Sequence, residues 1–233
     1  MEKQTANDKI LSYNDVVLRR SDLAILNGPY FLNDRIIEFY FSYLPSTFPE
    51  ASEDILLLPP SITFWIKECP DSASLKDFIE PLQLPQRKLI IFPINDNDDV
   101  TAAGGGTHWS LLAFDRKTNL FVHHDSSGCL NKKHSKRVYK AVVAYTETDA
   151  KYIDCSSTPR QVNGFDCGLY VTAIARAICK WCVSERHDYN MESLWFSTIE
   201  EQITPSLVTN MRNEILELVR NLMVKQENRV ARK

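Results

Sequence analysis

The segment from Cys167 to Cys182 has the strongest helical pattern in the chain and constrains the fold more than any other feature. Its apolar stripe recurs at helical spacing and is widened by small or apolar neighbours: Gly168, Val171, Ala175, Ile178 and Cys182, with Leu169, Ala173 and Ala177. A helix that is apolar around most of its circumference is buried, so the rest of the chain must pack around it. This predicts a layered fold with that helix inside.

The length and composition allow one core of this kind. The chain has 233 residues, of which 44% are hydrophobic and 24% charged, the balance of a globular protein. No repeat, low-complexity block or long Gly/Ser linker marks a boundary. We expect a single domain over residues 1–233, with flexible tails at 1–9 and 226–233.

Three apolar, β-rich segments predict a sheet. Lys88 to Ile94 is apolar throughout, as in a strand buried on both faces. His108 to Phe114 and Leu120 to Asp125 follow, separated by five turn-forming residues that suit a hairpin. Between the first two segments, residues 95–107 are rich in Gly and Asp and are expected to form a mobile loop.

Other helices are indicated by local signals. Asn33 is a candidate cap for a helix that ends before Pro45, and Thr204-Pro205 can start the last helix. Residues 62–68 suit one or two helical turns, and residues 132–145 form an amphipathic pattern. Together these segments predict an α+β protein whose central mixed or antiparallel sheet is flanked by helices.

Several classes of function are disfavoured by the composition. No apolar run approaches the roughly 20 residues of a membrane span, and no secretory signal is visible, so we expect an intracellular protein with free thiols. The net charge is −3 and the basic residues are scattered, so nucleic acid is not expected as a partner. Cys179 and Cys182 form a C-x-x-C motif, but no second pair accompanies it, so core packing is preferred over zinc or redox chemistry, and neither metal nor cofactor is expected.

Cys167 is the candidate nucleophile. It follows the Asn163-Gly164-Phe165-Asp166 turn at the start of the buried helix, where unpaired amides and the helix dipole stabilise a thiolate. Gly168 is expected to leave room for a substrate backbone. The alternative is an inert core thiol, which is the interpretation for Cys69, Cys155, Cys179 and Cys182, while Cys129 is expected to be exposed.

His108 is the candidate base, with Asp125 as its partner. If Asp115 pairs with Leu120, His108 becomes the diagonal neighbour of Asp125 on one face of the hairpin, at about 7–8 Å between backbone positions. A slip of one residue would separate them. A satisfied structural histidine is the competing interpretation for His108, and two rival bases, His123 and His124, lie on the same strand; the remaining histidines, His134 and His187, are expected at the surface.

Four motifs occur in an order that resembles a known family. They are Gly-Gly-Thr-His-Trp-Ser at 105–110, His-Asp-Ser at 124–126, Gln161, and Asp-Cys-Gly at 166–168. This order is similar to the adenain-like, papain-like superfold of the ubiquitin-like-protein proteases. The resemblance extends to the small deneddylase branch of the sentrin/SUMO-specific proteases through Leu32-Asn33-Asp34 and residues 94–104. One departure is Phe31, where that family usually has Trp.

The resemblance implies roles for the site residues. His108 would take the proton of Cys167, Asp125 would orient the imidazole, and the thiolate would attack the carbonyl after a C-terminal Gly-Gly. Gln161 would stabilise the oxyanion, against the alternative of an exposed loop glutamine. Trp109 and Phe31 would form the walls of a narrow tunnel for the diglycine tail, against the alternative that Trp109 belongs only to the core.

The resemblance also implies a function. We expect a monomeric cysteine protease, cytoplasmic or nuclear, that matures a Nedd/Rub-type modifier and removes it from conjugates such as cullins. Residues 95–107 would then form a lid over the bound modifier, which hydrogen exchange with and without the modifier would test. The alternatives are a SUMO-specific protease, a binding module that retains the fold without cutting, and an acetyltransferase on the same fold.

Overall fold

The computed structural model describes residues 5–102, 104–184, 195–196 and 199–230. Its centre is a five-stranded sheet: β3 Ile55–Leu57, β4 Leu89–Asn95, β5 Trp109–Asp115, β6 Leu120–His124 and β7 Lys151–Asp154. The α-helices are α1 Arg20–Asn27, α2 Asp34–Tyr43, α3 Pro60–Glu68, α4 Ser72–Ile79, α5 Lys132–Val142, α6 Cys167–Val183, α7 Ile199–Gln202 and α8 Pro205–Val230. A separate hairpin consists of β1 Lys9–Tyr13 and β2 Val16–Arg19. Short 3₁₀ turns span Leu44–Thr47, Pro49–Ala51, Glu80–Leu82, Leu84–Gln86 and Val143–Thr146.

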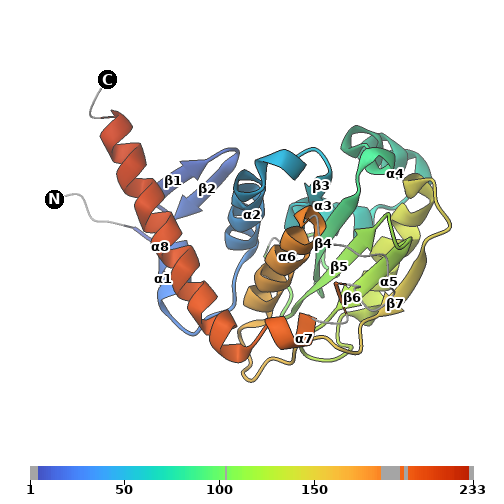
Figure 1. Cartoon of the computed structure of the whole chain (residues 1–233). Helices are drawn as coiled ribbons and strands as arrows, with labels where there is room; N and C mark the ends of the chain where they lie inside the picture. The colour runs from blue at the N-terminus through green and yellow to red at the C-terminus, as the bar shows by residue number, and fades with distance from the viewer. Residues whose placement is uncertain (1–4, 103, 185–194, 197–198, 231–233) are drawn as a thin grey trace.

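The sheet is mixed, with strand order β3-β4-β5-β6-β7. Its two outer pairs are parallel and its two inner pairs are antiparallel. Helices cover both faces, with α6 on one side and α5 on the other (Figure 1). The α+β architecture expected from the sequence is therefore present, and α6 begins at Cys167 as predicted.

Strand β4 shows why the sheet has two cores. Leu89 and Ile91 pack with α6, whereas Ile90 and Phe92 pack on the opposite face with α3 and α5. Successive side chains of a strand point to opposite faces, so a strand between two helical layers must be apolar at every position. This is the physical reason for the unbroken apolar run in the sequence.

The predicted hairpin has the expected register. Asp115 is paired with Leu120, and the ladder continues to Leu111 opposite His124. One step further, Ser110 and Asp125 would be opposite each other, so His108 and Asp125 occupy the same face. The hairpin therefore brings the two candidate residues together.

The helix signals are also confirmed. The side chain of Asn33 accepts a hydrogen bond of 3.1 Å from the N–H of Ile36 and caps α2, which ends at Tyr43. Helix α8 begins at Pro205. The predicted helix over 132–145 is α-helical only to Val142 and finishes as a 3₁₀ turn.

The predicted tails are partly wrong. Strand β1 already begins at Lys9, and α8, which packs beside β1, continues to Val230 (Figure 1). The N–H of Ser12 donates to Oε1 of Gln226 over 3.1 Å, which joins the two ends of the chain. This contact spans 214 positions, so no local pattern predicts it.

Some elements were not predicted at all. They include β1, β2, α1, α4 and the edge strand β7. Each is short, and β7 exists because it pairs in parallel with β6, a partner that precedes it by a full helix. Pairing with a neighbouring strand in the folded protein thus outweighs the intrinsic strand preference of the segment. Among the described residues, no helix combines the length and apolar character that crossing a membrane requires.

Candidate active site

Cys167 is the first residue of α6 and is fully buried. Asp166, in a non-helical conformation, precedes it, and the carbonyl of Asp166 accepts the N–H of Tyr170 over 3.0 Å. The first amides of a helix have no partner within the helix, and they carry its positive partial charge. The sulfur of Cys167 therefore lies where a negative charge is stabilised.

His108 contacts both Asp125 and Cys167. Its Nε2 donates to Oδ1 of Asp125 over 2.7 Å, and the ring also interacts with the Cys167 side chain. Burial favours the neutral ring, but hydrogen bonds to Asp125 and Cys167 outweigh it and raise the pKa of His108 to about 9. The imidazole is therefore protonated at neutral pH beside the candidate nucleophile.

Asp125 is held in place by the turn that follows it. The N–H of Ser127 donates to its Oδ1 and the N–H of Asn131 to its Oδ2, both over 2.9 Å. Burial favours the neutral acid, but the hydrogen bonds from His108, Asn131 and Ser127 outweigh it and lower the pKa of Asp125. Asp125 is therefore an ionised acceptor with a fixed orientation.

The rival histidines occupy other environments. His123 bridges Ser110 and Asp154 at 3.0 and 3.1 Å, and its pKa is lowered, chiefly by burial. His124 contacts Thr158 over 3.0 Å, and complete burial lowers its pKa to about 3. His123 is a satisfied core histidine, whereas His124 is held by one hydrogen bond and by packing against Trp195, with the ring centroids 5.0 Å apart. His187 lies outside the described residues.

Two residues that the sequence analysis did not select support His108. Asp96 accepts hydrogen bonds from the backbone N–H groups of Thr107 and His108, over 2.6 and 3.0 Å. The Asn131 amide donates to the carbonyls of Ile94 and His108, over 3.2 and 3.1 Å. These contacts join both ends of the 95–107 segment to the backbone of His108, which directly precedes β5. In the sequence, both residues look like ordinary polar loop residues.

Gln161 lies beside the turn that follows Asp125. Its Nε2 donates to the carbonyl of Asn163 over 2.7 Å, and its Oε1 accepts from the Ser126 hydroxyl over 2.7 Å. A carboxamide has two N–H donors, so this arrangement fixes the group while one donor remains for a ligand. The glutamine is only partly exposed, which differs from the alternative of a fully exposed loop residue.

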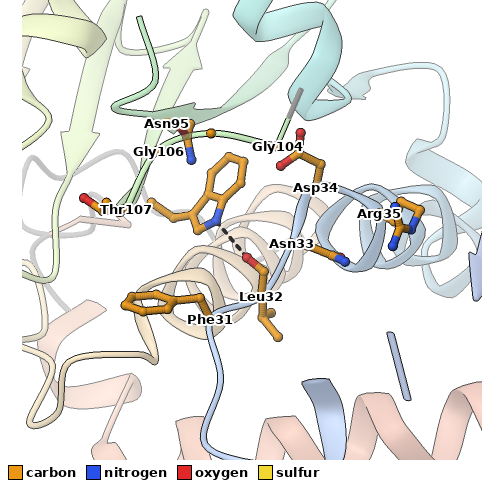
Figure 2. A pocket seen from close by; sticks show the side chains of 11 residues that line it. Phe31, Leu32, Asn33, Asp34, Arg35, Asn95, Gly104, Gly106 and Thr107 are labelled. Atoms are coloured by element: carbon orange, nitrogen blue, oxygen red, sulfur yellow. Dashed lines mark hydrogen bonds between the residues drawn. The ribbon is translucent and has the colours of Figure 1, made fainter. Parts of the chain in front are cut away.

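A groove of about 510 Å³ runs between the α2 N-terminus and the 95–107 segment (Figure 2). Trp109 and Phe31 both line it. The Trp109 indole is 5% exposed and its Nε1 donates to the carbonyl of Leu32 over 2.9 Å, whereas Phe31 is 50% exposed. The Trp109 indole therefore belongs to the hydrophobic core and also lines the groove. The exposed phenyl ring of Phe31 is available to cover a ligand.

At two positions glycine is required because a Cβ atom would lie too close to a neighbouring residue. A Cβ on Gly106, whose φ is +87°, would lie 1.9 Å from Oδ1 of Asn95 on the groove floor. A Cβ on Gly168 would lie 2.9 Å from the Cβ of Leu32. The expectation that Gly168 leaves space for substrate is therefore wrong, because Leu32 occupies that space and brings α6 against the groove.

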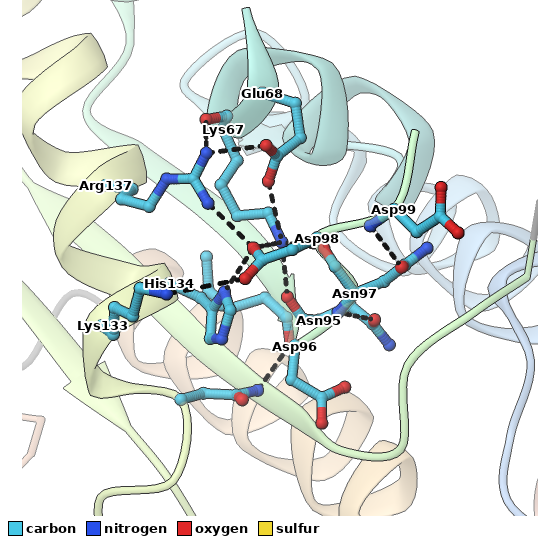
Figure 3. A network of polar contacts seen from close by, with 12 residues as sticks. Lys67, Glu68, Asn95, Asp96, Asn97, Asp98, Asp99, Lys133, His134 and Arg137 are labelled. Carbon is cyan, nitrogen blue, oxygen red and sulfur yellow. Dashed lines mark hydrogen bonds and ion pairs between the residues drawn. The ribbon is translucent and has the colours of Figure 1, made fainter. Parts of the chain in front are cut away.

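A polar network anchors the start of the 95–107 segment to α3 and α5 (Figure 3). The buried ammonium of Lys67 donates to the carbonyls of Asn95 and Asn97. Asp98 forms ion pairs with Lys67 at 3.7 Å, Lys133 at 3.6 Å and Arg137 at 2.8 Å, and it lies 3.2 Å from Nδ1 of His134, whose pKa is lowered, chiefly by burial. His134 is buried here, so its predicted surface position is wrong: α5 turns it toward Asp98.

The other cysteines are separate from the site. Cys179 is buried along α6, and burial raises its pKa; burial also raises the pKa of Cys182, to about 11. Cys129 is exposed, as expected. Among the described residues, no three His, Cys, Asp or Glu side chains are grouped so that they could hold a metal ion.

Comparison with known proteins gives a consistent picture. A family model described as the Ulp1 protease family, C-terminal catalytic domain, matches residues 30–222. The chain is 50% identical to NEDD8-specific protease 1 of Arabidopsis thaliana over 224 residues, which cover 96% of this chain and 97% of that protein. It is 34% identical to Sentrin-specific protease 8 of Homo sapiens over 219 residues, covering 93% and 98%.

A solved structure is similar as well. The X-ray structure of the C-terminal Ulp1 protease domain in complex with Smt3, the yeast ortholog of SUMO, matches with a TM-score of 0.65 and 19% identity. The match covers 94% of this chain and 90% of that one. At this identity the likeness shows the fold alone, and it confirms the predicted fold class.

Proposed function

The chain belongs to the Ulp1 protease family, and from this premise we propose that it cleaves a NEDD8-type ubiquitin-like modifier after its C-terminal Gly-Gly. Membership confirms the resemblance that the sequence motifs carry, and it makes the chain a cysteine protease. The proposed activity has two forms. One matures a modifier precursor, and the other releases the modifier from a lysine of a target protein.

The arrangement around His108 is the observation that carries the proposal. The ring is hydrogen-bonded to Asp125 and also interacts with the Cys167 side chain, and its pKa is raised to about 9. A protonated imidazole next to a cysteine at a helix N-terminus stabilises a thiolate, which is the reactive form of the thiol. We assign Cys167 as nucleophile, His108 as acid and base, and Asp125 as the group that orients the ring.

The proposed reaction has two stages. The Cys167 thiolate attacks the carbonyl of the terminal glycine, and His108 gives its proton to the departing amine, which leaves an acyl-enzyme thioester. Water, deprotonated by His108, then hydrolyses the thioester and restores the thiolate. The Cys167 N–H and the Gln161 amide are the proposed donors to the oxyanion of each tetrahedral intermediate.

The groove suits a tail without side chains. Trp109 forms one wall and Phe31 the other, with Gly104, Gly105 and Gly106 along the rim. The Trp109 ring is held by its bond to Leu32, so this wall cannot retreat without breaking a buried hydrogen bond. Such a wall would admit two glycines and exclude a larger residue.

The names of the relatives support a NEDD8-type modifier. The relative that is 50% identical over nearly the whole chain is named a NEDD8-specific protease. The solved complex with a SUMO ortholog, at 19% identity, supports the shared fold alone. We propose that residues 1–233 act as one monomeric domain; cullin conjugates are proposed as targets on the family resemblance alone.

Activity-based probes test the modifier choice. The protein should be incubated with NEDD8, SUMO and ubiquitin that each carry a C-terminal propargyl group, and adducts at Cys167 should be quantified by mass spectrometry. We expect the NEDD8 probe to react at least tenfold faster than the others. Faster labelling by SUMO would overturn the substrate assignment, and a Cys167→Ala variant that is still labelled would overturn the nucleophile.

A further inference from the structure

Arg212 on α8 holds four groups with one guanidinium. Its Nη1 donates to the carbonyls of Ile25 and Gly28 over 3.0 and 2.9 Å. Its Nη2 donates to the carbonyl of Tyr30 and to Oδ1 of Asp166, both over 2.9 Å. The Arg212 side chain is 12% exposed, and that of Asp166 is 8% exposed. A buried side chain with every bond directed at backbone or carboxylate is a fixed connection.

The partners of Arg212 flank the two parts of the candidate active site. Asp166 directly precedes Cys167, and Tyr30 directly precedes Phe31, the exposed wall of the groove. We propose that Arg212 is a positioning residue that sets the spacing between the groove wall and the nucleophile and neutralises the Asp166 carboxylate. This inference rests on the proposed function, since the groove and the sulfur must act on one substrate.

The same connection reaches the proposed oxyanion donor. The second oxygen of Asp166 accepts from the amide of Asn163 over 2.7 Å, and Oδ1 of Asn163 accepts from the N–H of Asp166 over 3.0 Å. The carbonyl of Asn163 accepts from Nε2 of Gln161, which in turn binds Ser126. A continuous hydrogen-bonded path therefore runs from Arg212 to the residue after Asp125.

The charge of Arg212 has a separate effect. Asp166 is a buried carboxylate next to the residue that must become a thiolate, and a nearby negative charge opposes thiolate formation. Among the described residues, two positive groups interact with Cys167 or Asp166: His108, which directly precedes β5 and interacts with the Cys167 side chain, and Arg212 on α8, which contacts the carboxylate. Without Arg212, the Asp166 charge would act on the sulfur uncompensated.

Arginine and lysine can separate the two roles. A lysine at position 212 would keep the positive charge beside Asp166, but a single ammonium cannot reproduce a planar fork that holds three carbonyls. Glutamine would remove both the charge and the fork. The matched control is Arg220→Gln on the same helix, because Arg220 is half exposed and bonds Glu217 and Asn27 away from the site.

Two measurements on the full-length protein would be made below the melting temperature of each variant. The first is kcat and KM for a NEDD8-type modifier with a C-terminal fluorogenic amide. The second is the pH profile of Cys167 alkylation by iodoacetamide, followed on the Cys167 peptide by mass spectrometry. Alkylation needs no modifier, so it reports on the sulfur independently of the proposed substrate.

The variants are expected to differ in a defined way. Arg212→Gln should lower kcat by about tenfold or more, since small displacements of reacting groups are costly. It should also move the midpoint of the alkylation profile upward by about one pH unit, because the Asp166 charge is no longer compensated. Arg212→Lys should show the kcat loss with the wild-type pH profile, and Arg220→Gln should match wild type in both.

Several outcomes would contradict the proposal. Wild-type kcat in folded Arg212→Gln or Arg212→Lys would overturn the positioning role, and an unchanged pH profile in Arg212→Gln would overturn the charge role. If Arg212→Gln does not fold, the kcat of Arg212→Lys decides the positioning role. The double variant Arg212→Met/Asp166→Asn then decides the charge role. It removes both charges of the pair, so its alkylation profile should match that of wild type, and a shifted profile would contradict the charge role. A wild-type protein without turnover would contradict the proposed function, while the alkylation profiles would still test the charge role.

Discussion

Nε2 of His108 lies 2.7 Å from Oδ1 of Asp125, at the open end of the hairpin, where His108 directly precedes β5 and Asp125 directly follows β6. The strand register places both side chains on the same face, and the loop amides of Ser127 and Asn131 fix the carboxylate. The contact orients the imidazole toward Cys167 and stabilises its protonated form.

Replacing Asp125 should remove most of the activity and leave the fold intact. We expect Asp125→Asn to lower kcat/KM by about 100-fold or more, since the imidazole loses its orienting charge. The matched control is Asp154→Asn, which alters the neighbouring carboxylate that contacts His123 at 3.1 Å. Steady-state kinetics would give kcat/KM for both variants. A similar loss of kcat/KM in the two variants would contradict the assignment of Asp125 as the residue that orients His108.

The pair should make folding stability depend on pH. The pKa of His108 is raised from 6.5 to about 9, so the protonated ring stabilises the folded state fully below pH 6.5. This contribution is lost as the pH rises through 9. The free energy of unfolding of wild type and of His108→Asn should be measured by urea denaturation at several pH values. The difference between the two free energies should decrease as the pH rises from 6.5 to 9. A difference that grows over this range would contradict the assigned protonation.

The exposed wall of the groove should affect binding more than chemistry. Phe31→Ala should raise the Kd of a NEDD8-type modifier by about tenfold when measured in the inactive Cys167→Ala background, because the tail loses its apolar cover. Phe31→Trp should lower it by restoring a larger ring. Val224→Ala, another exposed apolar position but on α8, is the control. Equal Kd values for Phe31→Ala and the control would exclude Phe31 from the site.

The proposed oxyanion donor should act on the transition state alone. Gln161→Ala is expected to lower kcat by about 100-fold while KM stays near the wild-type value, since the donor is needed only once the oxyanion forms. Gln86→Ala, at an exposed glutamine in a 3₁₀ turn, is the control. A variant that raises KM and preserves kcat would instead place Gln161 in substrate binding.

The buried Lys67 should determine the order of the groove rim. Lys67→Met removes the bonds to the carbonyls of Asn95 and Asn97, so the amides of residues 95–98 should exchange hydrogen faster and KM should rise. Lys76→Met is the control, because Lys76 forms only an exposed pair with Glu80. Unchanged exchange in Lys67→Met would show that the remaining ion pairs of Asp98 suffice.

Local patterns in the sequence were sufficient for much of the central fold. The periodicity after Cys167, the cap at Asn33 and the start at Pro205 all depend on residues within a few positions of one another. The hairpin register followed from a short connection between two strands. These signals identified Cys167 and made the pairing of His108 with Asp125 plausible.

The sequence by itself thus determined where the buried helix starts and which residues can supply a thiol, an imidazole and a carboxylate. Only the tertiary structure decided which of three histidines contacts the sulfur, that Gly168 yields its space to Leu32, and that Arg212 joins Asp166 to the groove wall. The physical reason is range: caps and periodicity act within a few residues, whereas the Trp109 bond to Leu32 spans 77 positions and the Arg212 bond to Asp166 spans 46. Contacts of that length exist only after the layers have packed.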